Sequence, residues 1–384
     1  MTTKTAGQRP GRMVKAGEGY YAFVPDPPPQ EIGWTPALVR ALSDADRLVG
    51  RLAGEGGRLP NPHLLIRPFI AREAVHSSRI EGTQATIGEL LASEAGAAIE
   101  RSPDDLHEVG NYVVALEYGI KRLKTLPLSL RLVRELHKKL MSGVRGNQAT
   151  PGEFRRTQNW IGPPGSRIAN ATYVPPPPPE MMEALGEWEK YMHLTTMPPL
   201  VQIAIGHYQF EAIHPFLDGN GRVGRLLITL FLVERKILPS PLLYLSAFFE
   251  ATRREYYDRL RGVTEAGRWG DWVEYFLNGV ARQSEDALSR AERINTLLGE
   301  WRNRIAGAPS KTPAQLLALL AENPFCTIKG AAERLGVAFT TAQRAVERLE
   351  KEKILTQTSE SKRDRVYCAR EILAILEEPP HLGG

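Results

Sequence analysis

The segment from His214 to Arg225 reads HPFLDGNGRVGR, and it constrains the fold more strongly than any other part of the chain. Gly219, Gly221 and Gly224 lack a Cβ, so backbone amides in this segment can approach a ligand closely. An apolar stretch with helical spacing follows, which predicts a loop that closes on a helix N-terminus. Free amides and the positive end of a helix dipole make such a place a site for anions.

Four side chains in the same run suit polyphosphate chemistry. Arg222 and Arg225 are three residues apart, so both can reach one polyphosphate from a single helical face. Asp218 supplies a hard oxygen for Mg²⁺, which commonly binds through one or two carboxylates plus phosphate oxygens. His214 can accept a proton near neutral pH. The alternative is that the run has no function: it would be a glycine-rich start of a helix whose arginines lie on a solvated face.

Most of the chain up to Arg304 carries apolar residues at helical spacing, so the predicted fold class is predominantly α. Thr35 is a candidate N-cap with Pro36 at the first helical position, and Gly82 is a candidate C-terminal stop. A chain of 384 residues is expected to form two or three folded units. The predicted helices cover residues 35–51, 64–82, 102–124, 128–141, 179–193, 199–213, 226–235, 246–261 and 269–304.

Two stretches depart from this helical pattern. Residues 1–19 are basic and lack the apolar segment of a signal peptide, so they are interpreted as a flexible tail. The prolines after Tyr20 predict an extended strap docked on the body. From Gly143 to Pro179 the periodicity fails, and short β-prone pieces flank a Pro-Gly turn. A loop of this length in a compact domain usually has a function.

The run from His214 matches the Fic motif, His-x-Phe-x-(Asp or Glu)-Gly-Asn-Gly-Arg-x-x-Arg, at every specified position. The chain therefore resembles the Fic family of protein adenylyltransferases, and the resemblance extends from about Tyr20 to Arg304. It implies an N-terminal helical region at 20–125 and a helical Fic catalytic domain at 126–305. A short β-hairpin flap is implied at about 150–178.

The resemblance also assigns roles to the residues of the motif. His214 is implied as the general base that deprotonates the target hydroxyl, and Phe216 as the anchor of the loop in the core. Asp218 is implied as the ligand of Mg²⁺, and Asn220 as a catalytic residue that stabilises charge on the α-phosphate. The implied phosphate-binding residues are Gly219, Asn220, Gly221, Arg222, Val223, Gly224 and Arg225, with Arg225 orienting the γ-phosphate.

The reaction that the resemblance implies is transfer of AMP from ATP to a Tyr, Thr or Ser hydroxyl of a target protein, and of the enzyme itself. Gly221 favours AMP transfer, because relatives that phosphorylate their targets resemble this motif with a lysine there. Another nucleotide or a phosphocholine donor stays open at this point.

A second motif precedes the catalytic domain. The stretch SSRIEG places Ser77 and Glu81 four residues apart, on one helical face, ahead of Gly82. Such a pair is usually a solvated helix face, but here it resembles the inhibitory motif of the family, (Ser or Thr)-x-x-x-Glu-(Gly or Asn). The resemblance implies that Glu81 pairs with Arg225 and restrains transfer. In some relatives the same glutamate positions a water that removes AMP, so a reverse reaction stays open.

Two further regions match features of the family less specifically. The family's flap docks an extended segment of the target by strand pairing, and an ordinary surface hairpin is the alternative for this stretch. The stretch 246–257 is interpreted either as the wall of the adenine pocket, with Ala251 as the contact, or as plain helix core. The implied flap residues are Arg167, Ile168, Ala169, Asn170, Ala171, Thr172, Tyr173 and Val174.

Residues 311–375 predict a separate winged helix-turn-helix domain, with three short helices and a hairpin that has a basic tip. Eleven Lys and Arg against seven Asp and Glu between Lys311 and Arg370 make a net charge of +4, most of the +5 of the chain. This charge suits DNA, although winged helices also mediate protein contacts and dimerisation. The candidate DNA contacts are Thr341, Gln343, Arg344, Arg348, Lys362 and Arg363.

The rest of the composition narrows the class of protein. Two cysteines are too few for a disulfide framework or a cysteine metal site. No apolar run has the ~18 residues of a spanning helix, so a cytoplasmic enzyme without membrane contact is expected, and a homodimer is possible by analogy with the family. The alternative function is a DNA-binding transcription regulator that uses its Fic module as a nucleotide sensor.

Overall fold

The structure is a computed structural model. It describes residues 9–17, 19–58, 62–99, 103–144, 150–163, 165–239, 241–307, 310–358 and 365–380.

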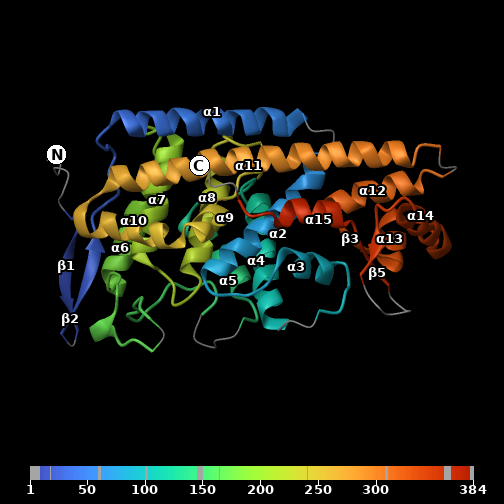
Figure 1. Cartoon of the computed structure of the whole chain (residues 1–384). Helices are drawn as coiled ribbons and strands as arrows, with labels where there is room; N and C mark the ends of the chain where they lie inside the picture. Colours follow the sequence, from blue (N-terminus) through green and yellow to red (C-terminus); the bar gives the residue numbers. More distant parts are fainter. Residues whose placement is uncertain are drawn as a thin grey trace.

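The body of the protein is a helical assembly in which two long helices, α1 (Pro36–Arg58) and α11 (Trp269–Arg304), lie side by side along one edge (Figure 1). Thr35 caps α1 as predicted, because its Oγ1 accepts a hydrogen bond of 3.1 Å from the Leu38 amide. The other body helices are α2 (Pro62–Ile80), α3 (Ile87–Glu94), α4 (Pro103–Arg122), α5 (Leu130–Leu140), α6 (Pro178–Met192), α7 (Pro199–Ile213), α8 (Asn220–Glu234), α9 (Ser246–Ala251) and α10 (Arg253–Ala266).

Helices α7 and α8 lie at the centre and carry the Fic motif between them. Both helices are buried on nearly all faces, so α7 lacks the polar stripe of a surface helix. Because neighbouring helices hold both of them on every side, the loop that joins α7 to α8 starts and ends on rigid supports.

The predicted helices are present, with three differences. The predicted helix at 246–261 is divided at Thr252 into α9 and α10. Helix α8 begins at Asn220 rather than 226, so the second half of the motif is helical. Helix α3 was not predicted, although Thr86 and Glu89 form a capping box in which the Glu89 amide donates to Thr86 Oγ1 at 3.1 Å.

The predicted flexible tail at 1–19 is wrong for part of its length. Strand β1 (Gly11–Ala16) pairs antiparallel with β2 (Tyr20–Pro25), which begins the predicted strap. The pairing forms because β2 is itself held by the body: Ala22, Phe23 and Val24 are buried, and the Phe23 amide donates to the Val174 carbonyl at 2.9 Å. A local pattern in the basic segment could not indicate that partner.

The C-terminal part has the predicted winged-helix architecture. A three-stranded antiparallel sheet has the strand order β3-β5-β4, and the helix-turn-helix is formed by α13 and α14. Thr327 caps α13 and Gly336 ends it with a φ of 65°, as predicted. The elements are α12 (Thr312–Glu322), β3 (Phe325–Thr327), α13 (Ile328–Leu335), α14 (Phe339–Lys351), β4 (Thr356–Gln357), β5 (Val366–Cys368) and α15 (Arg370–Glu377).

The winged helix packs against α2, α3 and α11 of the body, at the right of Figure 1. Asn323 donates to the Leu91 carbonyl at 2.9 Å in a buried contact. The buried Arg290 of α11 pairs with Asp286 at 2.8 Å and also donates to carbonyls at the end of α15. Asp286 in turn pairs with Arg72 of α2 at 3.3 Å. These buried polar contacts give the two parts a defined relative orientation.

None of the helices in the described part of the chain combines the length and the apolar character needed to cross a bilayer.

Candidate active site

The motif loop is closed by its own side chains. Helix α7 ends at His214, whose backbone is left-handed with a φ of 50° and a ψ of 61°. Asn220 then bonds back to Phe216 twice: its Oδ1 accepts from the Phe216 amide at 2.8 Å, and its Nδ2 donates to the Phe216 carbonyl at 2.9 Å. Because a left-handed residue other than glycine is strained, these bonds hold a conformation that the chain would otherwise avoid.

His214 is held as a neutral base. Its Nδ1 lies 3.3 Å from the Glu211 carbonyl oxygen. Because a carbonyl only accepts hydrogen bonds, the proton lies on Nδ1 and Nε2 keeps its lone pair. Burial, and then the nearby Arg155 guanidinium, lower the pKa of His214 to about 4. The imidazole can therefore accept a proton at neutral pH.

Phe216 is buried, as expected for a loop anchor, and packs on His137 of α5. The two rings stack with centroids 3.7 Å apart. His137 Nδ1 accepts from the Gly152 amide at 2.8 Å, so the Nε2 proton is donated to the Asp218 carbonyl at 3.1 Å. Burial lowers the pKa of His137 to about 4, which keeps this ring neutral. His137 therefore holds the motif loop through its stacking on Phe216 and its hydrogen bond to Asp218.

The glycines of the motif have steric roles. Gly219 has a φ of 78°, in the left-handed region that favours glycine, and a Cβ there would lie 2.9 Å from the sulfur of Met141. A Cβ at Gly221 would collide with Glu81 and lie 2.8 Å from Arg225 Nη1. A Cβ at Gly224 would meet the Glu211 carboxyl. The first turn of α8, which includes Val223, thus offers amides to an anion. The space beside Gly221 is filled by the Glu81 carboxylate and the Arg225 guanidinium.

Arg222 and Asp218 lie at the mouth of this turn. The Arg222 side chain is buried, 3.5 Å from Glu108 and 3.7 Å from Asp218, and its Nε and Nη1 make no hydrogen bond within the described structure. A buried guanidinium with unused donors suits an incoming phosphate. The Asp218 side chain is 60% exposed, so its carboxylate is open to a cation.

These residues fit a magnesium ion that is bound together with a nucleotide. Within the described residues there is no group of three or more His, Cys, Asp or Glu side chains that could hold a metal alone. Mg²⁺ needs fewer protein ligands when phosphate oxygens and waters complete its shell. Asp218 would be the protein ligand.

Arg225 points to the other side, toward α2. It is buried and donates from Nε to Ser77 Oγ at 2.8 Å, and from Nη2 to the Ser77 carbonyl at 2.9 Å. Its Nη2 also lies 2.6 Å from Glu81 Oε1. Burial would raise the pKa of Glu81, but attraction to Arg225 outweighs it and holds the pKa of Glu81 below its ordinary value. Gly82, with a φ of 106°, ends α2 next to this pair.

The flap differs in detail from the predicted hairpin at 167–174. Residues 168–170 form a 3₁₀ turn, η1, since the Asn170 side chain accepts from the Arg167 amide at 2.7 Å and favours a turn. Within the described part of the flap, the strand pairing is one antiparallel bridge between Ile161 and Tyr173. The arms of the hairpin therefore lie further apart in sequence, and Ala169, Ala171 and Thr172 lie between them.

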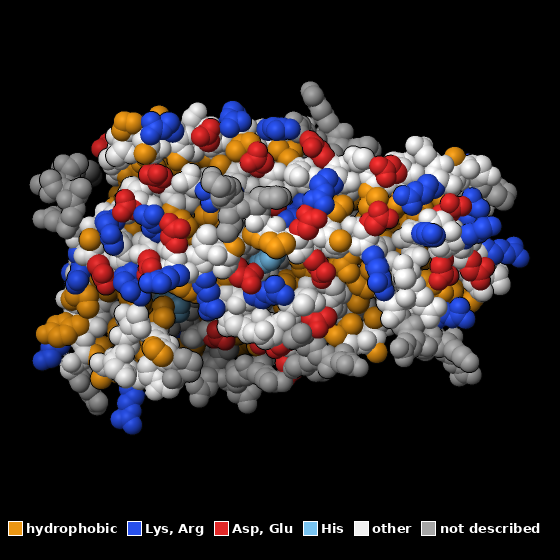
Figure 2. Space-filling view, viewed as in Figure 1, with side chains coloured by type: hydrophobic (Ala, Val, Ile, Leu, Met, Phe, Trp, Pro, Cys, Tyr) orange, Lys and Arg blue, Asp and Glu red, His pale blue; other side chains and the backbone are white. Residues whose placement is uncertain are grey.

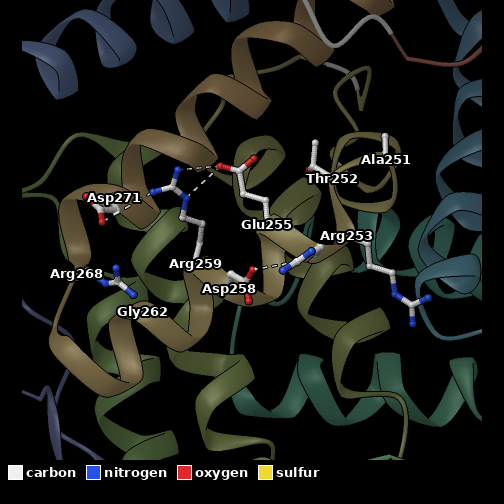
Figure 3. A pocket seen from close by; sticks show the side chains of 10 residues that line it. Ala251, Thr252, Arg253, Glu255, Asp258, Arg259, Gly262, Arg268 and Asp271 are labelled. Atoms are coloured by element: carbon white, nitrogen blue, oxygen red, sulfur yellow. Dashed lines mark hydrogen bonds and ion pairs between the residues drawn. The ribbon is translucent and has the colours of Figure 1, made fainter.

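Ala251 lies at the end of α9. It lines an open cavity of about 550 Å³ between α9, α10 and the start of α11. Figure 3 shows Arg253, Arg259 and Arg268 around this cavity with Asp271, and none of its lining residues belongs to the run from His214 to Arg225. The adenine contact predicted at Ala251 stays a prediction.

The candidate DNA contacts on α14 are not equivalent. Arg344 is exposed, whereas Gln343 donates to Glu347 at 2.8 Å and Arg348 pairs with Glu352 at 3.0 Å. Thr341 is half-buried. Lys362 and Arg363 lie outside the described residues.

Sequence reasoning missed three residues that hold the loop. His137 stacks on Phe216, and Arg155 donates to the carbonyl of His214. Glu211 is a carboxyl beside Gly224 whose pKa is raised to about 7 by burial. His137 continues the apolar helical spacing of α5 with Val133 and Leu140, which indicates that it is buried but does not indicate its partners. Arg155 is marked only as a charged pair with Arg156 inside a non-helical stretch.

Comparison with known proteins agrees with this geometry. Residues 39–121 match the Fic/DOC family N-terminal region, and residues 127–232 match the Fic/DOC family itself. The part of the chain from residue 39 to residue 232 thus belongs to the Fic/DOC family. Residues 310–356, which lie outside the Fic region of the chain, match the winged helix-turn-helix DNA-binding family.

Curated relatives of this Fic protein are named Protein adenylyltransferase Fic. The one from Drosophila erecta is 30% identical over 165 residues, which cover 41% of this chain and 31% of the relative. The one from Drosophila yakuba is 30% identical over 219 residues, which cover 56% of this chain and 40% of the relative. The chain therefore spans less than half the length of these relatives.

Solved structures show the same fold. A Fic family protein from Desulfovibrio desulfuricans G20 has a TM-score of 0.59 at 21% identity, over 90% of this chain and 98% of that chain. A Fic domain containing signaling protein from Bacteroides thetaiotaomicron VPI-5482 has a TM-score of 0.50 at 21% identity, over 68% of this chain and 97% of that one.

Proposed function

We propose that this Fic protein transfers AMP from ATP to a side-chain hydroxyl of a target protein, and to its own hydroxyls. The observation that carries the proposal is a neutral imidazole with a free Nε2 at the entry of a helix N-terminus that offers amides and a partly unsatisfied Arg222. The curated relatives named Protein adenylyltransferase Fic support the same reaction class.

In the proposed reaction the hydroxyl oxygen of the target attacks the α-phosphorus of ATP. The bond from this phosphorus to the bridging oxygen breaks, and pyrophosphate leaves. The hydroxyl proton goes to Nε2 of His214, and the amides of the first turn of α8 and Arg222 stabilise the negative charge that develops. Mg²⁺ held at Asp218 would add positive charge beside the phosphates.

We further propose that Glu81 restrains this reaction. It lies 2.6 Å from Arg225, the residue that the family resemblance assigns to the γ-phosphate. While the pair exists, the guanidinium is unavailable and the carboxylate repels a triphosphate in a cleft of low dielectric constant. Removal of AMP from a modified target, with Glu81 orienting a water, is a reverse reaction that the same site allows. A cytoplasmic location and a homodimer stay predictions from the sequence.

The experiment that tests the function uses intact-mass analysis. Glu81→Gly protein is incubated with Mg-ATP, with and without cell extract, and mass additions of AMP are recorded on the protein and on extract proteins. His214→Ala in the same background should abolish AMP addition and leave ATP binding within severalfold, because the imidazole acts on the hydroxyl and not on the phosphates. Equal loss of ATP binding and transfer would make His214 a structural residue and contradict the proposed mechanism.

A second candidate function is DNA binding through α14. The observation that favours it is that α14 packs on α12 and α13 and leaves its opposite face in solvent, where Arg344 is exposed and Phe339 is 53% exposed. On the face in Figure 2, basic and acidic side chains are interspersed, also over the winged helix, so phosphate contacts there have weak electrostatic support. In this alternative the protein is a DNA-binding regulator whose Fic site binds a nucleotide as a sensor and transfers no AMP.

A further inference from the structure

Arg155 is a buried cation that the proposed mechanism does not use. Its side chain is 2% exposed and lies under the loop that joins α7 to α8. Among the described residues, no carboxylate lies within ion-pair distance of it. A buried charge of this kind is unfavourable unless polar groups surround it, so its partners show what it stabilises.

Among the described residues, all hydrogen-bond partners of the Arg155 guanidinium are backbone carbonyls, and they come from three segments. Its Nε donates to the His214 carbonyl at 2.9 Å, and its Nη2 approaches the Ile213 carbonyl at 3.5 Å. Its Nη1 donates to the Thr157 carbonyl at 3.2 Å, and Nη2 also donates to the Pro176 carbonyl. The guanidinium thus joins the C-terminus of α7 to both arms of the flap.

The bonds at α7 address two problems of the active-site backbone. The last carbonyls of a helix lack intrahelical donors and carry the negative end of the helix dipole, so a cation there is stabilising. His214 is also left-handed, and the Arg155 amide donates to the Pro215 carbonyl at 2.9 Å directly after it. Arg155 therefore holds the strained backbone that aims the imidazole.

The bonds to the flap complete the connection. Beyond Thr157, Gln158 donates to the Pro175 carbonyl at 2.8 Å and Asn159 donates to the Phe216 carbonyl at 2.8 Å. On the return arm, the Tyr173 hydroxyl donates to the Ala212 carbonyl at 2.6 Å. A displacement of either arm of the flap would therefore be transmitted to the loop that carries His214. Within the described structure, Arg155 bonds to both arms and to His214.

We propose that Arg155 is a positioning residue: it fixes the backbone of His214 and joins it to the flap, so that the flap conformation and the placement of the base are linked. This inference rests on the proposed AMP transfer and adds no chemical step to it. The charge of Arg155 has a second effect, because it favours the neutral imidazole. Three other groups around His214 act in the opposite direction and raise its pKa: Glu81, Asp218 and the Glu211 carbonyl to which it is bonded.

The test compares neighbouring arginines in Glu81→Gly protein. Arg156 is the matched control, since its side chain is 87% exposed and meets only Glu153, at 3.4 Å, among the described residues. Initial rates of automodification with Mg-ATP are measured from about pH 3.5 to pH 8, so that the range includes the His214 pKa of about 4, and ATP binding is measured by equilibrium dialysis. Arg155→Gln should lower the rate by about 10²-fold through misplacement of the base, and ATP affinity should stay within about threefold.

Two features separate positioning from general damage. In Arg155→Gln the acidic limb of the rate profile should move to higher pH, because the imidazole loses a neighbouring positive charge. Arg155→Lys keeps the charge but cannot serve all three segments, so it should lose rate without this shift. Arg156→Gln should stay within about twofold of the background, as expected for an exposed side chain.

The outcomes against the inference are equally defined. A rate for Arg155→Gln close to that of Arg156→Gln would overturn it, and so would a parallel loss of rate and ATP affinity, which indicates collapse of the loop. If Arg155→Gln does not fold, Arg155→Lys decides by the same rate and binding measurements. If the Arg156→Gln control transfers no AMP at all, the proposed function fails, and the inference fails with it.

Discussion

At the scale of single residues, the site is organised by how each charged group is paired. Arg222 is only partly satisfied, Arg225 is bound to Ser77 and Glu81, and His214 is neutral. The protein thus has one arginine ready for a phosphate and one that is occupied. Which of the two limits the reaction can be tested by changing Glu81.

Glu81→Gly should raise automodification at least tenfold, or about 1.4 kcal/mol of transition-state stabilisation. The gain should appear mainly in the rate of transfer, because in the proposed restraint ATP binds the wild type in an unproductive pose. Combining Glu81→Gly with Arg225→Ala should erase the gain, and this non-additivity is the mark of a direct pair. A double variant as active as Glu81→Gly alone would show that the restraint lies elsewhere.

At the scale of elements, α14 has one face packed on α12 and α13 and one face in solvent. Some of the side chains that could contact DNA are already paired along the helix, since Gln343 is bonded to Glu347 and Arg348 to Glu352. Arg344 remains as the exposed cation of the candidate set within the described residues.

If α14 binds DNA, affinity for duplexes selected from a random pool should fall steeply between about 50 and 200 mM salt. Arg344→Ala should weaken sequence preference by about 1–3 kcal/mol at one position, whereas Arg348→Ala should have a smaller effect. Fluorescence anisotropy with selected and scrambled duplexes measures both. Binding that ignores salt would favour the protein-contact interpretation of this domain.

At the scale of the whole molecule, several buried ionisable groups are neutral in the folded state. Burial lowers the pKa values of His137 and His214 to about 4 and that of His207 to about 3, while it raises the pKa of Glu211 to about 7. At pH 5 the unfolded chain holds nearly three protons at these histidines that the folded protein excludes, and the folded protein holds about one extra proton at Glu211.

The unfolded state thus gains a net of about two protons, so the free energy of unfolding should fall by about 3 kcal/mol per pH unit as the pH drops from 6 to 5. Above pH 7 the histidine contribution is fully present. Urea unfolding midpoints at pH 7, 6 and 5 measure this slope. Equal midpoints across the range would show that these histidines are hydrated in the folded protein.

The sequence by itself determined the helical class, the winged helix and the motif loop. Each of these depends on information that is local: apolar spacing for helices, Thr35, Thr327 and Gly336 for their ends, and twelve consecutive residues for the loop. A capping box at Thr86 was equally local, and its signal was available although the short helix α3 was not predicted.

Only the tertiary structure decided which distant groups meet. Arg155, His137 and strand β1 obtain their roles from carbonyls, a ring and a strand elsewhere in the chain, and no spacing in their own segments encodes those partners. The contact between Glu81 and Arg225 was implied by the resemblance to the family and not by any local pattern. It joins positions 144 residues apart, and it forms because α2 and α8 pack together in the core. Local patterns determine where helices and strands form, whereas tertiary packing determines which charged side chains are buried and which groups they pair with.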